Sequence, residues 1–150
     1  MKKLFLVMLT IWATSALTQW ASILVHKPNG NEKLALGKKY TIVWAFFGTP
    51  HPASQTVQID LYKGGKARSN RIGTIAKDLP IGHQNSQPTP SGSFAWKVGT
   101  YNGGSVVPGS DYYIRIFCMQ NTTYDSDFSD KSFSLITFDP FEKGSLSSRP

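Results

Sequence analysis

The chain of 150 residues is long enough for one domain and at most two, and its 40% hydrophobic and 17% charged residues are ordinary for a globular protein. The formal charge is +7, and it falls to about +5 (7 − 2) if Lys2 and Lys3 leave with a signal peptide. The single cysteine excludes an intramolecular disulfide, but about 115 residues suffice for a core without disulfide or metal support.

The N-terminus has the layout of a secretory signal peptide. Two lysines precede an apolar run over residues 4–13, and small residues follow it. Thr14 and Ala16 fit the −3 and −1 positions, so we expect cleavage after Ala16, with Ala21 as the alternative. The run is shorter than the about 20 residues that a membrane-spanning helix requires. A signal peptide within residues 1–21 is therefore predicted to be cleaved off, after Ala16 or Ala21, and the protein to be secreted.

Beyond this segment, apolar residues recur at every second position, as is typical of half-buried β-strands. Turn residues such as Pro28-Asn29-Gly30 separate these stretches, and none shows the 3.6-residue period of a helix. The predicted strands are residues 23–25, 40–46, 57–62, 72–75, 94–98, 112–118 and 133–136. About seven short strands favour an all-β, antiparallel two-sheet sandwich over residues 22–137, followed by a tail over residues 138–150.

Two predicted loops stand out by their length. Residues 48–56 contain His51, and residues 80–92 contain His83, each among prolines and polar residues. We expect both loops to remain unpacked, either as recognition loops or as tolerated insertions. In a further predicted loop, Asn121 begins an Asn-Thr-Thr sequon and is a glycosylation candidate.

The basic residues are scattered, apart from a group between Lys63 and Arg71. An excess of basic residues can indicate nucleic acid, an anionic membrane or an acidic polymer such as wall polysaccharide. A solvated basic face that keeps the protein soluble is the simpler explanation. If a polyanion binds, residues 63–71 are the best location for it. We expect no nucleic-acid partner, and no membrane insertion once the signal is removed.

No catalytic or metal motif is evident. The chain lacks a Gly-x-Ser-x-Gly elbow, a zinc motif and a phosphate-binding loop, and its three histidines share no ligand spacing. Asp125, Asp127 and Asp130 alternate as calcium ligands do, but a calcium loop's glycine and distal glutamate are missing, so we expect strand-end caps. Asp60 and Asp111 are too far apart in the pattern to form a glycosidase pair. We therefore expect no enzyme, no metal and no cofactor.

The strand phase separates inward from outward side chains. Trp44 and Trp96 fall on inward phases and are expected to fill the core. Cys118 alternates with Ile114 and Ile116, which predicts a buried free thiol.

Four further aromatic residues are candidates for ligand contact. Tyr62, Tyr113 and Phe117 fall on the outward phase of their strands, and Tyr101 lies in a glycine-rich loop. An outward row of aromatic rings can stack on sugar rings, contact another subunit, or be covered by the tail over residues 138–150. These three interpretations remain open at this point.

Several strand-and-turn motifs occur in a fixed order: Leu36–Trp44, Val57–Gly65, Gly92–Val98, Gly109–Ile116 and Ser129–Leu135. Over residues 22–137 this order resembles the N-terminal immunoglobulin-like domain of the yeast cell-wall synthesis family, whose founding members act in β-1,6-glucan assembly. The resemblance implies an immunoglobulin-like β-sandwich and supplies no catalytic residues. We expect the chain to depart from that family in its two long loops and in having no Ser/Thr-rich region with an anchor signal.

The resemblance and the outward aromatic residues together predict a secreted, non-catalytic cell-wall or extracellular-matrix protein that binds polysaccharide or assembles at the cell surface. The alternative is a self-assembling structural subunit of an extracellular filament or coat, in which residues 136–141 add a strand to a neighbouring copy. The candidate ligand contacts are Tyr62, Tyr101, Tyr113, Phe117, His51 and His83.

Overall fold

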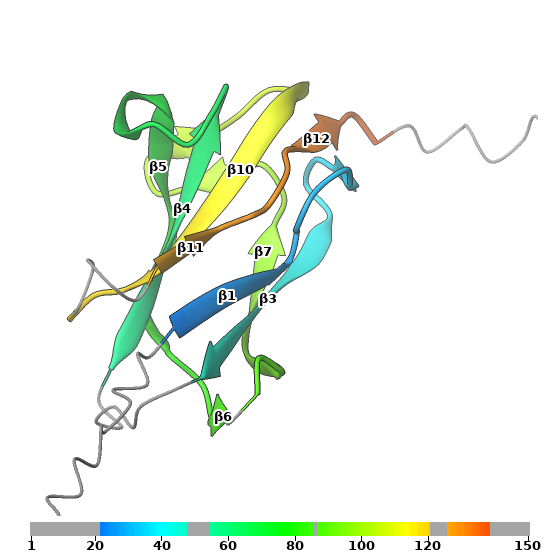
Figure 1. The fold of residues 1–150 in the computed structure, drawn as a ribbon. Coiled ribbons are helices and arrows are strands. Elements are labelled where there is room, and N and C mark those ends of the chain that lie inside the picture. Colours follow the sequence, from blue (N-terminus) through cyan, green and yellow to red (C-terminus); the bar gives the residue numbers. More distant parts are fainter. Residues whose placement is uncertain (1–21, 48–54, 86, 121–125, 139–150) are drawn as a thin grey trace, which may run out of the picture.

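The computed structural model describes residues 22–47, 55–85, 87–120 and 126–138, and there the chain forms two facing β-sheets and a short hairpin (Figure 1). The predicted all-β sandwich is thereby confirmed. The predicted signal peptide, His51, Asn121 and the tail after Phe138 lie outside the described residues.

The first sheet is built on β3 (Lys39–Phe47). Strands β1 (Ser22–Lys27) and β7 (Pro90–Lys97) pair with it antiparallel, and the two-residue β6 (Gln84–Asn85) pairs parallel with its last residues. Figure 1 shows β6 at the end of β3.

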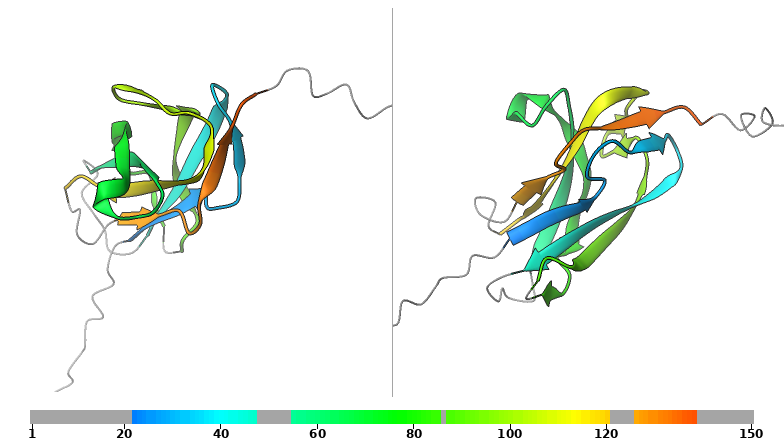
Figure 2. Two further views of the ribbon diagram at one scale, coloured as in Figure 1. Left: turned by 90° about the horizontal axis from the view of Figure 1, so that it is seen from above. Right: turned by 45° about the vertical axis from the view of Figure 1, so that its right-hand side comes forward.

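The second sheet has the order β2 (Lys33–Ala35), β12 (Phe133–Ile136), β10 (Gly109–Cys118), β4 (Thr56–Lys63) and β5 (Arg71–Pro80). The short β11 (Ser126–Phe128) also pairs with β10, and only the β2–β12 pair of this sheet is parallel. A 3₁₀ turn, η1 (Arg68–Asn70), precedes β5, and the separate hairpin joins β8 (Thr100–Tyr101) to β9 (Gly104–Ser105). Figure 2 shows both sheets from two further directions. No helix in the described ranges is long and apolar enough to cross a membrane.

The core lies between the two sheets and follows the predicted alternation. Trp44 and Trp96 are each 1% exposed, so their predicted place in the core is confirmed. Cys118 is a buried free thiol, also as predicted, and it donates a weak hydrogen bond to Gln55 Oε1 at 3.4 Å. The seven predicted strands are all present, whereas β2, β6, β8, β9 and β11 were not predicted because two or three residues show no period.

The expectation that residues 80–92 form an unpacked loop is wrong. Ile81 is buried, and its carbonyl accepts a hydrogen bond of 2.8 Å from Trp44 Nε1. A buried indole N–H requires an acceptor, and this segment supplies it. Pro88 is also held, since its carbonyl lies 3.0 Å from Nε2 of His26.

The acidic segment after residue 125 joins the edges of the two sheets. Asp127 of β11 accepts a hydrogen bond of 2.8 Å from the backbone N–H of Val25 in β1. Asp130 and Asn29 bond reciprocally, each at 2.8 Å, through the Asp130 N–H and the Asn29 side-chain amide. Within the described residues, no three His, Cys, Asp or Glu side chains gather as a metal site would require. Both carboxylates therefore act as caps for backbone and amide groups.

The contact between Gly92 and Trp44 gives the first prediction. The two residues are partners in the β3–β7 register, and a Cβ atom on Gly92 would overlap the buried indole ring. Gly92→Ala should therefore lower the free energy of unfolding by roughly 2–4 kcal/mol through overpacking and loss of the Trp44–Ile81 hydrogen bond. Urea denaturation followed by tryptophan fluorescence measures this change.

Gly109→Ala is the matched control. An added Cβ there would meet its nearest atom, Lys63 Nζ, at an ordinary 3.5 Å, so we expect its stability to stay close to that of the wild type. Equal stabilities for both variants would show that the indole has room to move.

Candidate functional site

A hollow of about 620 Å³ opens on the outer face of the second sheet, the face turned away from the core. It lies over β4, β10 and β11 and the turn that connects β4 to β5. Its lining residues are Gln58, Asp60, Tyr62, Lys66, Arg68, Arg71, Arg115, Phe117 and Phe128.

The strand register brings these residues together. In the β4–β10 pair, Asp60 lies opposite Arg115 and Gln58 lies opposite Phe117. On the other side of β10, Arg115 also lies opposite Phe128 of β11. Because alternate residues of a strand share one face, all five side chains project to the outer side of the sheet.

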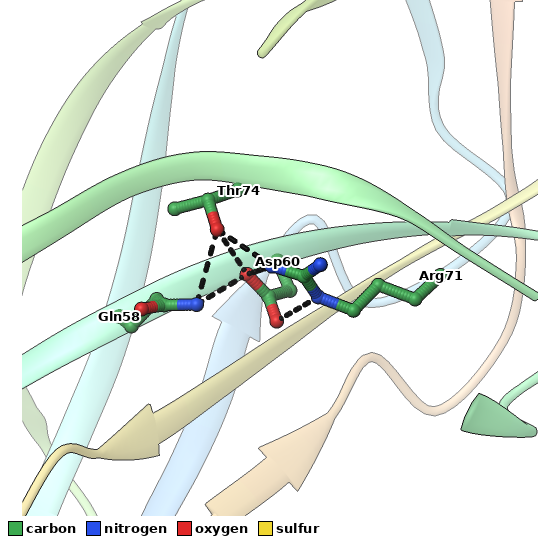
Figure 3. Close-up of polar contacts among 4 residues, drawn as sticks. All are labelled: Gln58, Asp60, Arg71 and Thr74. Atoms are coloured by element: carbon green, nitrogen blue, oxygen red, sulfur yellow. Dashed lines mark hydrogen bonds and ion pairs between the residues drawn. The ribbon is translucent and has the colours of Figure 1, made fainter. Parts of the chain in front are cut away.

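Asp60 is the most constrained residue of the hollow (Figure 3). It is 3% exposed, and its carboxylate accepts hydrogen bonds from Arg71 Nε at 2.6 Å and Arg71 Nη2 at 3.1 Å. Gln58 Nε2 donates to it at 2.7 Å, and the Thr74 hydroxyl donates at 3.0 Å. A buried carboxylate is tolerated only when it is compensated in this way.

The same network holds Arg71. Its Nη2 also donates to the Thr74 hydroxyl at 2.7 Å. The hydrogen bond to Asp60 raises the pKa of Arg71 above its ordinary value, and the nearby negative charge adds to this against the opposing effect of burial. Arg71 therefore stays charged, and the charge of Asp60 is balanced within the protein.

Three of the predicted aromatic residues lie on this outer face. Phe117 lines the hollow, and its ring centroid lies 4.9 Å from the guanidinium carbon of Arg115. Tyr113 is half-buried, with the Lys66 ammonium 5.6 Å from its ring centroid. Tyr62 also lines the hollow but is only 3% exposed, because Phe128 packs edge-on against it at 5.0 Å. The outward phase of Tyr62 thus does not make it a solvent-exposed ring.

The other candidates do not line the hollow. Tyr101 packs over Gly73, where an added Cβ would come within 2.6 Å of its ring, and His83 is exposed between β5 and β6. His51 and Asn121 lie outside the described residues. Phe138, the one described residue of the tail, has the Lys38 ammonium 3.6 Å above its ring and does not cover the outer aromatic row.

Sequence reasoning missed Arg115 and Phe128 as site residues. Phe128 belongs to a strand of three residues, which is too short to show a phase. Arg115 could have been found, because it occupies the outward position between Ile114 and Ile116. The segment 63–71, by contrast, was predicted as the best polyanion location, and Lys66, Arg68 and Arg71 all line the hollow.

The lining residues carry four positive charges and one negative charge, a balance of +3 (4 − 1). Glycoside hydrolysis by the usual mechanism requires two carboxylates across a cleft. Among the described lining residues, Asp60 is the only carboxylate, and it is occupied by its four hydrogen bonds. Among the described lining residues, the hollow therefore does not present the pair of carboxylates that this mechanism uses.

A family model described as Kre9/KNH-like N-terminal Ig-like domain matches residues 27–134. The matched range includes every residue that lines the hollow. No curated protein and no solved structure matches the chain.

The Asp60 network gives the second prediction. Asp60→Asn removes the charge that holds Arg71 and weakens two further hydrogen bonds, so we expect a loss of about 2 kcal/mol in the free energy of unfolding. This loss of unfolding free energy is smaller than for a fully buried ion pair, because the Arg71 side chain is 38% exposed and its guanidinium can be solvated by water instead. The urea midpoint measures the loss.

Asp78→Asn removes the same charge from an exposed residue of β5, and its positive φ of 56° is one that asparagine adopts readily. We expect this control to have the same free energy of unfolding as the wild type. If Asp60→Asn also had the wild-type free energy of unfolding, the Asp60 network would not stabilise the sheet.

Proposed function

Because this chain belongs to the Kre9/KNH-like N-terminal Ig-like domain family, we propose that it is a secreted, non-catalytic cell-wall protein that binds wall polysaccharide in the hollow over β4 and β10. The family is associated with cell-wall β-glucan synthesis rather than catalysis. The observation that carries the proposal is the joint presence of aromatic rings and fixed hydrogen-bonding side chains in one hollow.

The chemistry of the hollow suits a saccharide. A pyranose ring has apolar C–H faces and a rim of hydroxyl groups, so it is bound by aromatic faces flanked by polar side chains. Phe117 of β10 and Phe128 of β11 supply half-buried rings that line the hollow, and Tyr113 lies on the same outer face of β10. Gln58 and Arg71 supply amide and guanidinium groups that the Asp60 network holds in place.

The scaffold also favours binding. The lining residues project mainly from paired strands, whose backbone is held by the sheet, so little entropy is lost when a ligand is bound. A volume of about 620 Å³ lies within the range of known ligand sites.

Three of the edge strands, β1, β2 and β5, give little support to the self-assembly alternative. Strand addition needs a long, exposed edge, and short or charged edge strands oppose it. The backbone N–H of Val25 in β1 is already bonded to Asp127, and β2 has only three residues. The edge strand β5 carries the exposed charges Lys77 and Asp78 near its end. Light scattering on the secreted protein separates the two functions, because a filament or coat subunit would form large assemblies.

The third prediction tests polysaccharide binding directly. The secreted protein should be retained on insoluble wall polysaccharide, tested separately as β-1,3-glucan, β-1,6-glucan, chitin and acidic wall fractions. Phe117→Ala should weaken retention about three- to tenfold, which corresponds to the loss of one aromatic contact. Depletion from the supernatant at increasing polysaccharide concentration measures the affinity.

Phe138→Ala is the matched control, since it removes a 51% exposed ring outside the hollow and should leave binding unchanged. Thermal melting of both variants checks that they are folded. Absence of wild-type retention on every polysaccharide would contradict the proposed function, and equal losses in both variants would contradict its location.

A further inference from the structure

We infer that the polysaccharide bound in the hollow is acidic and carries carboxylate or phosphate groups that Arg115, Arg68 and Lys66 contact. This inference rests on the proposed function and adds the chemical class of its ligand. It depends on which charges of the hollow are balanced within the protein and which are not.

The one carboxylate among the described lining residues, Asp60, already forms an ion pair within the protein. Asp60 lies opposite Arg115 in the strand register, yet it pairs with Arg71 from the neighbouring strand β5. Within the described part of the chain, Arg71–Asp60 is the one ion pair, and neither Arg115, Arg68 nor Lys66 has a carboxylate within 4 Å. Among the described residues, these three cations of the hollow therefore have no carboxylate partner.

Arg115 is the best placed of the three to hold an anion. It is half-buried, with Nη2 donating to Ser126 Oγ at 3.1 Å and with the rings of Phe117 and Phe128 4.9 Å and 5.7 Å from its guanidinium carbon. Its Nε is buried and has no hydrogen-bond partner among the described residues. The rings keep water from the guanidinium and orient it, but they do not neutralise it. A partly desolvated cation attracts an anion more strongly than one in open water.

Lys66 and Arg68 add charge at the rim. The Lys66 ammonium is held 3.3 Å from the Asp130 carbonyl oxygen and 5.7 Å from the Phe128 ring centroid. Arg68 begins the turn η1 and is exposed, and its side chain has no hydrogen bond or ion pair to a described residue. Its guanidinium is therefore free to form a two-pronged contact with a carboxylate or phosphate.

A neutral glucan would not require this arrangement. Its hydroxyl groups need donors and acceptors in similar numbers, whereas three unbalanced cations repel one another until an anion arrives. A free phosphate ion is also a poor fit, since it would leave most of a hollow of about 620 Å³ and its aromatic lining unused. The combination fits a sugar ring that bears an acidic group.

Isothermal titration calorimetry on the secreted protein tests this with matched ligand pairs. One arm compares an oligogalacturonate with its methyl ester, which keeps the ring and removes the charge. The other compares a phosphorylated mannan oligosaccharide with its dephosphorylated form. At least one acidic member should bind about tenfold or more tighter than its neutral partner and should weaken as salt rises from about 50 to about 300 mM. The arm that responds identifies the acidic group.

Substitutions of the cations test whether the acidic ligand binds in the hollow. Arg115→Gln and Arg68→Gln should each weaken binding of the acidic ligand by about five- to tenfold, and should thereby lower the ratio of its affinity to that of its neutral partner. Lys97→Gln, which removes an exposed charge from β7 in the other sheet, should have no effect. The Arg68 side chain makes no hydrogen bond or ion pair with a described residue, so its variant stays informative if Arg115→Gln is unstable.

The outcomes separate the two proposals. If neutral β-glucan and acidic oligosaccharides bind equally, the inference of an acidic ligand fails while polysaccharide binding stands. If no saccharide binds, both fail. Inorganic polyphosphate serves as an anion without a sugar ring, and equal affinity for it would overturn the acidic saccharide in favour of a general polyanion surface.

Discussion

The antiparallel pairing of β4 with β10 fixes both faces of the second sheet. Seven consecutive residue pairs join these strands, from Tyr112 opposite Lys63 to Cys118 opposite Val57, without a bulge. Ile59 and Ile116 are opposite each other and completely buried, so the core determines the register. A shift by one residue would turn every inward side chain outward. The register that packs the core therefore also sets the residues of the hollow.

The outer face differs from an ordinary solvated face in having a buried polar centre. Strand β5, which pairs with β4 through a bulged register, brings Arg71 and Thr74 onto Asp60. The alternation pattern places the Asp60 carboxylate on the outer face, but these contacts shield it from water. The ion pair between Asp60 and Arg71 has an electrostatic consequence for Arg115 of β10. Because Asp60 bonds to Arg71, the guanidinium of Arg115 is left against aromatic rings instead of against the carboxylate opposite it.

Much of the fold could be predicted from the sequence, because the period of two is a local signal. It identified the seven longer strands, the two core tryptophans and the buried Cys118. It did not identify what covers the outer face, since that depends on contacts between distant segments. Phe128 covers Tyr62 on the outer face from a three-residue strand. In the core, Ile81 accepts the hydrogen bond of the Trp44 indole from a segment that the sequence predicts as a polar loop. Of the aromatic residues that line the hollow, Tyr62 and Phe117 were therefore predicted as candidates, whereas Phe128 and the burial of Asp60 and Tyr62 were not.

A filled sandwich core leaves little interior space for a ligand, so a binding site on this fold has to form at a loop end or on a sheet face. Residues at a loop end can vary in sequence and conformation. Residues on a sheet face are held in fixed positions by the backbone hydrogen bonds of the sheet. The described hollow belongs to the second kind. Its strands hold Arg115 and Phe117 two residues apart, and only Lys66 and Arg68 come from a turn. For the proposed acidic polysaccharide, such a surface offers a rigid ring contact from the strands and cations from the turn at its rim.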